Sequence, residues 1–171
     1  MNYRLRYSIQ GALFIATGLV LPMLFHSMGL GPIFLPMFWP MALAGFYLPW
    51  PMALATGLLT PLLSSMMTGM PPVPVLWRMM IELAMLTTVT SLLHQKSRLP
   101  VLAATATALL CALLTGFGAA ALLAPLLGWP TWLYAFSSVT RSLPGVLSIL
   151  IIIPLLQQRL SRHIRTEGNR R

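Results

Sequence analysis

Long apolar runs, separated by short breaks, extend along the whole chain. A helix needs about 20 apolar residues to cross about 30 Å of hydrocarbon, and charged residues, proline and glycine mark the breaks between such helices. The pattern therefore predicts six membrane-spanning helices, at approximately 5–25, 33–48, 52–68, 75–93, 99–123 and 131–158. Only short loops and a basic tail at 159–171 remain, so we expect a compact all-α bundle that forms one integral membrane domain, 1–171.

The second and third predicted spans are short, and Pro36, Pro40 and Pro61 interrupt them. A charge-free turn at 48–51 joins them, so the pattern also allows one re-entrant hairpin in their place. Glycine and proline predict bent, non-helical backbone in the first and third loops. These residues are Gly29, Gly31 and Pro32 in the first loop, and Gly69, Pro71, Pro72 and Pro74 in the third.

Basic residues indicate the orientation of the chain, because cytoplasmic loops are rich in Lys and Arg. With six spans, nine basic residues fall on one side: Arg4, Arg6, Lys96, Arg98, Arg159, Arg162, Arg165, Arg170 and Arg171. The loops on the opposite side, at 26–32, 69–74 and 125–130, contain no Lys or Arg. We therefore expect both termini in the cytoplasm, with the chain in a bacterial cytoplasmic (inner) membrane.

Composition excludes an ordinary soluble domain, since 57% of the residues are hydrophobic and 8% are charged, against about 25% charged residues in soluble domains. A net charge of +9 is compatible with nucleic-acid binding in principle. However, the basic residues flank apolar runs and form no patch with interleaved aromatic residues. We expect no nucleic-acid partner, and we expect the basic residues to contact anionic lipid headgroups instead.

The residues required for catalytic and cofactor chemistry are missing from the sequence. The chain contains no G-x-x-x-x-G-K-[ST] phosphate loop and no Asp, and His26, His94 and His163 fall in different regions. We therefore expect no enzyme activity, no cofactor and no metal site. One alternative is a Met-lined metal carrier, because thioethers bind Cu(I). The methionines that bracket the third loop are Met66, Met67, Met70, Met79 and Met80.

Arg78, Glu82 and Arg141 fall inside predicted spans, where each charge costs at least ~2.5 to 3.5 kcal/mol on insertion scales. Arg78 and Glu82 are four residues apart and share a helix face, and Arg141 lies roughly 14 Å into the sixth span. We expect the three side chains to meet in the outer half of the bundle. They form either an ion network that locks helices together, or a pocket whose excess guanidinium group suits an anionic or zwitterionic ligand.

Aromatic residues gather near the same outer end, where they could stack on a flat ligand: Phe34, Phe38, Trp39, Trp77, Trp129 and Trp132. An interfacial aromatic belt is the alternative, and it accounts for Trp129 and Trp132 better than for Phe38 and Trp39. With residues of the first and third loops added, the predicted binding residues are His26, Phe38, Trp39, Met70, Trp77, Arg78, Glu82 and Arg141.

Three stretches of the sequence resemble a known family. They are FHSMGLGPIFLPMFWPMALAGFYL (Phe25–Leu48), TGLLTPLLSSMMTGMPPVP (Thr56–Pro74) and MIEL (Met80–Leu83). They are similar to the substrate-binding subunit, or S component, of energy-coupling factor (ECF) transporters over the first four spans, and the last two spans match in size and hydropathy. Phe38 stands where many similar members have His after LPM, and 85–87 (MLT) replaces the usual Tyr-Gly. These departures leave the identity of the substrate open.

The resemblance implies a six-helix protein that captures a vitamin or related micronutrient from outside. Such a protein docks on a transmembrane coupling subunit that is driven by two cytoplasmic ATPase subunits. Members commonly carry A-x-x-x-A on the first helix, where it contacts the coupling subunit, and Ala12 and Ala16 match this pattern. The alternative function is a non-transport scaffold subunit of the inner membrane with a similar bundle, which needs no ligand pocket.

Overall fold

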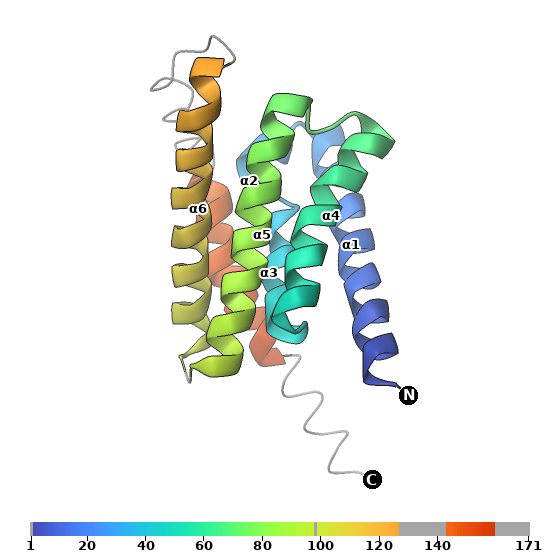
Figure 1. The fold of residues 1–171 in the computed structure, drawn as a ribbon, viewed down its shortest axis with the longest axis vertical. Coiled ribbons are helices and arrows are strands. Elements are labelled where there is room, and N and C mark those ends of the chain that lie inside the picture. Colours follow the sequence, from blue (N-terminus) through green and yellow to red (C-terminus); the bar gives the residue numbers. More distant parts are fainter. Residues whose placement is uncertain (1, 98, 127–142, 160–171) are drawn as a thin grey trace.

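The computed structural model describes residues 2–97, 99–126 and 143–159, and the secondary structure of this part is helical throughout (Figure 1). The helices are α1 (Tyr3–Ser27), α2 (Gly31–Phe34), α3 (Phe38–Tyr47), α4 (Trp50–Thr68), α5 (Val73–Lys96) and α6 (Val101–Leu126). A further helix spans Leu143–Arg159. The predicted all-α fold is therefore confirmed for the described residues.

Three stretches of helix are long and apolar enough to cross a membrane: Tyr3–Ser27, Val75–Lys96 and Val101–Leu122. They correspond to the first, fourth and fifth predicted spans, and they indicate a membrane protein. α4 follows the third predicted span and ends at the same residue, Thr68. The second predicted span is divided between α2, of four residues, and α3, of ten.

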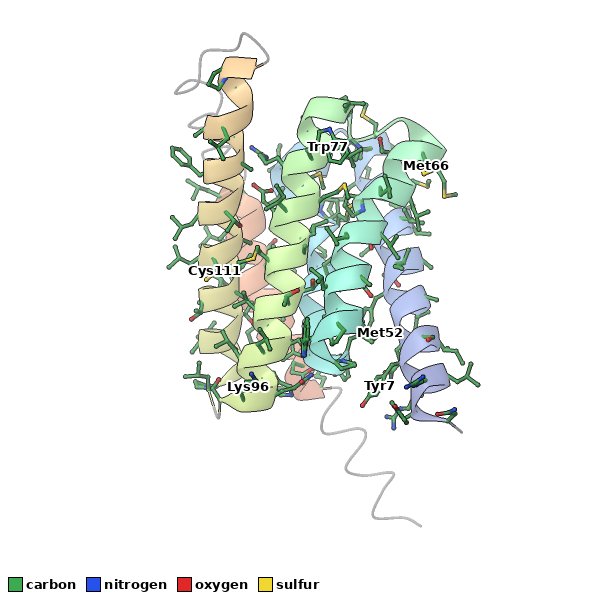
Figure 2. All side chains as sticks on the ribbon, in the orientation of Figure 1. Tyr7, Met52, Met66, Trp77, Lys96 and Cys111 are labelled. Atoms are coloured by element: carbon green, nitrogen blue, oxygen red, sulfur yellow. The ribbon has the colours of Figure 1, made fainter. Side chains whose placement is uncertain are left out.

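The helices are arranged as a bundle in which α5 lies between α6 and α4 (Figure 1). α1 flanks α4 on the far side from α5, and α3 lies behind, against α1, α4 and α5. The N-terminus and the α5–α6 turn lie at the lower end in Figure 1, and the α4–α5 turn lies at the upper end. Lys96 accordingly lies at the lower end, with Met66 and Trp77 at the upper end (Figure 2).

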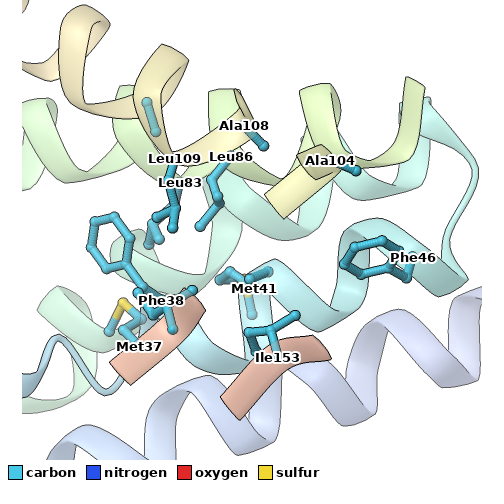
Figure 3. Packing of buried hydrophobic residues seen from close by; sticks show 13 residues of the cluster. Met37, Phe38, Met41, Phe46, Leu83, Leu86, Ala104, Ala108, Leu109 and Ile153 are labelled. Carbon is cyan, nitrogen blue, oxygen red and sulfur yellow. The ribbon is translucent and has the colours of Figure 1, made fainter. Parts of the chain in front are cut away.

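A hydrophobic core runs along the bundle between α3, α5, α6 and the Leu143–Arg159 helix (Figure 3). Its buried members are Met37, Phe38, Met41, Ala42, Phe46, Leu83, Leu86, Ala104, Ala108, Leu109, Ala112, Ile149 and Ile153. Lipid tails are as apolar as these side chains, so in a membrane close packing, rather than removal from water, stabilises such a core.

Glycine residues allow α3 and α4 to approach α5 closely. A Cβ atom at Gly57 would lie 2.7 Å from the Leu83 carbonyl oxygen and 2.8 Å from the Ala84 Cα atom. A Cβ atom at Gly45 would lie 2.8 Å from the Thr87 carbonyl oxygen. In both places the backbone of α5 and one of its threonine side chains occupy the space of the missing side chain, as is typical of small residues at membrane helix interfaces.

The turn between α3 and α4 is fixed by hydrogen bonds from α5. The Leu48 carbonyl oxygen accepts hydrogen bonds from Ser91 Oγ at 2.7 Å and from Gln95 Nε2 at 3.2 Å. Gln95 Nε2 also donates to Ser91 Oγ at 3.0 Å. Leu48 is fully buried, and a buried carbonyl oxygen needs such partners. The two donors therefore hold the turn at the lower end of α5.

Several proline and glycine residues behave differently from the prediction. Gly31 begins α2 with Pro32 in its first turn, and Pro74 lies in the first turn of α5, so the prediction of non-helical backbone at these residues was wrong. Proline is tolerated there because the first N–H groups of a helix have no intrahelical partner. Pro40 and Pro61 also lie inside continuous helices. The predicted bends at Gly29 and Gly69 are confirmed by φ values of 72°.

Candidate functional site

The candidate site is centred on the ion pair between Arg78 and Glu82 on α5. Arg78 Nε lies 3.4 Å from Glu82 Oε1, and their side chains are 18% and 8% exposed. The spacing of four residues brings the two groups to one face of the helix, as the sequence predicts. Both residues belong to the candidate membrane span Val75–Lys96, so two opposite charges are held within an apolar helix.

The Glu82 carboxylate points toward α6, where it lies against the buried residue Gly116. The apolar core lies next to the pair, because Leu83 follows Glu82 and packs with Phe38 and Leu109 (Figure 3). Phe38 is 3% exposed, which makes it a core residue. The pair thus lies beside the core, in the half of α5 that is nearer the upper end of the bundle.

The backbone is interrupted between α2 and α3, also toward the upper end. Leu35 adopts a left-handed conformation with a φ of 49°, and the buried residues Pro36 and Met37 separate the two helices. A Cβ atom at Gly145 would lie 2.9 Å from the Ile33 carbonyl oxygen, so the Leu143–Arg159 helix covers this break. Non-helical backbone at membrane depth is tolerated where protein buries it or where it lines a cavity.

Trp39 is held on two sides by other parts of the bundle. Its Nε1 donates a hydrogen bond to Ser148 Oγ at 3.1 Å, and its ring meets the Phe25 ring edge-on, with centroids 5.4 Å apart. Trp39 therefore fixes the start of α3 against both α1 and the Leu143–Arg159 helix. These contacts use the indole N–H that a ligand would otherwise engage.

Three further predicted binding residues, His26, Met70 and Trp77, lie at the upper end with much of their surface exposed. Met70 is 54% exposed and Trp77 is 52% exposed. His26 is also exposed, and its ring covers Gly31, where a Cβ atom would lie 2.6 Å from Nδ1. The Met70 loop is ordered by Ser64 Oγ, which donates to the Met70 carbonyl oxygen at 2.8 Å. These residues therefore belong to the exposed surface of the upper end, whereas Arg78 and Glu82 are largely buried.

Some predicted residues lie outside the part of the chain that the structure describes, and others lie on the exposed side of α1. Arg141, Trp129 and Trp132 lie outside the described residues, so the predicted meeting of Arg141 with Arg78 and Glu82 stays a prediction. Ala12 and Ala16 are both exposed on α1, whose buried side carries Gly11, Gly18 and Pro22. The residues 2–97, 99–126 and 143–159 contain no group of three His, Cys, Asp or Glu side chains able to hold a metal ion.

The sequence did not predict the contacts that Gly116, Gly145 and Ser148 make at this end of the bundle. The signal for Gly116 was its place in a series of small residues with Ala120 and Ala124, which predicts helix packing but not the side chain it meets. Ser148 is an isolated hydroxyl in an apolar run, and its partner Trp39 is 109 positions away in the sequence. Such long-range pairs depend on the fold.

Comparison of the chain with family models, with curated proteins and with solved structures finds no match.

Proposed function

We propose that this chain is the membrane-embedded substrate-binding subunit of an importer of the ECF type, not an enzyme. In this proposal it captures a vitamin or related micronutrient, anionic or zwitterionic, at the upper end of the bundle. It then delivers the substrate to a separate transmembrane coupling subunit and two cytoplasmic ATPase subunits. The proposal joins the resemblance of the sequence to the geometry of the Arg78–Glu82 pair.

The observation that carries the proposal is a buried ion pair inside an apolar helix. Ionisable residues within membrane spans are costly, and they usually mark substrate or ion pathways. The pair forms between two residues of α5, so it does not itself join two helices as a structural lock would. The α2–α3 break also favours a binding site at the upper end of the bundle, because interrupted helices form binding sites in many transporters.

The proposed membrane arrangement has six spans, with both termini in the cytoplasm of a bacterial inner membrane. In support, Arg4, Arg6, Lys96 and Arg159 all lie in helix ends at the lower end of the bundle. The positive-inside rule makes this the cytoplasmic end. The upper end, with Met70 and Trp77, then faces outward and receives the substrate.

The proposed docking surface for the coupling subunit is the exposed side of α1 that carries Ala12 and Ala16. In support, α1 is the least buried of the three candidate membrane spans. Small side chains allow another membrane helix to approach closely. This surface lies apart from the Arg78–Glu82 pair, so substrate binding and docking are separable by mutation.

A thermal-shift experiment on the purified full chain in detergent tests the binding site. The probes are biotin, pantothenate, thiamine and folate, which together present carboxylate, pyrimidine and pterin groups. We expect at least one probe to stabilise the wild type, and Glu82→Gln or Arg78→Gln to weaken its binding roughly tenfold or more, because a hydrogen bond to a charged group contributes about 1.5–3 kcal/mol. Arg141→Ala tests whether that residue belongs to the site.

Lys96→Gln is the matched control, since it removes an exposed charge from the same helix. Unchanged binding in Glu82→Gln and Arg78→Gln would exclude the site. A folded wild type that no probe stabilises favours the scaffold function, and stabilisation by Cu(I) alone favours the Met-lined carrier.

Docking is tested separately with Ala12→Trp and Ala16→Trp. We expect both variants to bind the probe as the wild type does, but to lose co-purification with the coupling subunit. Thr17→Trp is the control, because Thr17 is exposed but lies about 100° around the helix from Ala16. Normal co-purification of both alanine variants would exclude this surface.

A further inference from the structure

Gly116 on α6 has an unusual neighbour for a buried glycine. The three atoms nearest to a Cβ built on Gly116 are Oε1, Cδ and Cγ of Glu82, and all three would overlap it. An alanine at this position therefore cannot coexist with the Glu82 side chain as it now lies. The carboxylate occupies the space that a side chain at 116 would fill.

This contact differs from the glycine contacts that bring helices together. Gly45 and Gly57 each meet a threonine side chain together with a carbonyl oxygen of α5, so their missing side chains allow the backbones of two helices to approach. At Gly116 the three nearest atoms all come from one charged side chain, and none belongs to the backbone of α5. Gly118, two residues further along α6, has no atom within 4 Å of a built Cβ. A side chain at position 118 would therefore meet open space, unlike one at position 116.

A carboxylate whose position is already fixed binds a ligand more readily than a mobile one. Glu82 has several rotatable bonds, and immobilising such a side chain costs conformational entropy at each binding event unless the fold has already ordered it. Gly116 confines the carboxylate from the α6 side, and Arg78 holds it from one turn away on α5. A carboxylate fixed in this way accepts hydrogen bonds from N–H donors of a ligand without prior rearrangement.

We propose that Gly116 is a positioning residue, which seats the Glu82 carboxylate between α5 and α6 as the acceptor for an N–H or ammonium group of the substrate. This inference rests on the proposed function. It extends the site to α6 and specifies that the substrate carries a hydrogen-bond donor in addition to any anionic group. Gly116 acts through Glu82 and needs no contact with the substrate.

The first test measures the position of the carboxylate without a substrate. Dicyclohexylcarbodiimide, an apolar reagent that reacts with carboxyl groups in membranes, is applied to the detergent-purified chain, and mass spectrometry locates the adduct. The chain has two acidic side chains, Glu82 and Glu167, so the labelled peptides are easily assigned. We expect Gly116→Ala to raise labelling of Glu82 several-fold, because the carboxylate leaves its seat, while Gly118→Ala leaves labelling unchanged.

A compensating variant separates positioning from general packing. Glu82→Asp shortens the side chain by one methylene group, which draws the carboxylate back toward α5 and relieves part of the overlap with a Cβ at position 116. We expect Gly116→Ala to weaken binding of whichever of biotin, pantothenate, thiamine or folate stabilises the wild type by roughly ten- to hundredfold. We expect Gly116→Ala with Glu82→Asp to recover part of this loss, whereas Gly118→Ala binds normally.

The two proposals fail in different ways. Unchanged labelling of Glu82 in a folded Gly116→Ala variant would overturn the role of Gly116. A wild type that binds none of the four probes would contradict the proposed function, and the labelling result would still decide whether Gly116 seats the carboxylate. If Gly116→Ala does not fold alone, the double variant with Glu82→Asp takes its place. Its labelling and its binding are then compared with those of Glu82→Asp alone. Equal labelling and equal binding in that pair would exclude the role.

Discussion

Ser148 accepts a hydrogen bond from Trp39 Nε1 at 3.1 Å and donates one from the same hydroxyl to the Gly145 carbonyl oxygen at 2.6 Å. The contact joins the start of α3 to the Leu143–Arg159 helix, next to the α2–α3 break that Gly145 covers. An indole N–H in an apolar bundle needs a partner. The two residues therefore stabilise the part of the backbone that regular helical hydrogen bonds do not hold.

We predict that Trp39→Phe and Ser148→Ala each lower the free energy of unfolding by about 1 kcal/mol, the typical contribution of one hydrogen bond. The double variant should lose less than the sum, because either change removes the same bond. Thermal unfolding of the purified chain in detergent measures all three. Additive losses would mean that the Trp39–Ser148 bond does not contribute.

The hydrogen bonds to the Leu48 carbonyl oxygen give a second prediction. Ser91→Ala should cost about 1 kcal/mol, because Gln95 still donates to the same oxygen. Combining Ser91→Ala with Gln95→Leu removes both donors and leaves a buried acceptor without a partner, so we expect the double variant to lose more than the two single losses combined. Equilibrium unfolding of the three variants checks this order. A double variant that loses no more than the sum of the two single losses would contradict it.

The helical part of the fold was largely predictable, because it depends on local sequence. Apolar run lengths predicted α1, α5 and α6, and the end of α4 at Thr68 agrees with the predicted third span. Pro36 was expected to interrupt the second predicted span, and the break lies beside it at Leu35. The division of this span into two separate helices was not predicted, since hydropathy is continuous from 33 to 48. It depends on a proline at 36 and on Gly145, which comes close enough to cover the interrupted backbone.

The candidate site was predictable only in part, for a similar reason. The four-residue spacing of Arg78 and Glu82 is a local property, and it correctly placed them in contact. The surroundings of the pair depend on which helix packs against α5. The sequence interpretation placed Phe38 in a stacking surface, whereas the structure places it in the core. No periodicity indicates that position 116 must lack a side chain to admit Glu82.

The exposed surface of α6 gives a prediction that separates lipid contact from water contact. Leu110 and Leu114 are 58% and 62% exposed in the middle of the helix. If this surface faces lipid, Leu110→Arg and Leu114→Arg cost roughly 2.5–3.5 kcal/mol of insertion free energy each and reduce the membrane-inserted yield. A water-exposed surface would tolerate them within about 0.5 kcal/mol. Leu102→Arg, near the helix end, is the control, because its side chain can reach the interface.

Orientation is tested by cysteine labelling in intact cells with a membrane-impermeant maleimide. Cys111 is first replaced by alanine, and single cysteines are then placed at the exposed positions Asn2, Met67 and Leu99. We expect Met67→Cys to be labelled in intact cells, and Asn2→Cys and Leu99→Cys only after permeabilisation, because the basic end is retained in the cytoplasm. Labelling with the sides exchanged would contradict the proposed orientation.

The same method decides between two spans and a re-entrant hairpin for α3 and α4. Trp50 is 48% exposed and follows the α3–α4 turn, which Gln95 holds near the lower end of α5. If α3 and α4 are separate spans, Trp50→Cys reaches cytoplasmic water and is labelled after permeabilisation, together with Leu99→Cys. A re-entrant hairpin would keep this residue within the hydrocarbon, where maleimide does not react because the thiolate does not form. Absence of labelling from both sides would therefore reduce the proposed six spans to four and a hairpin.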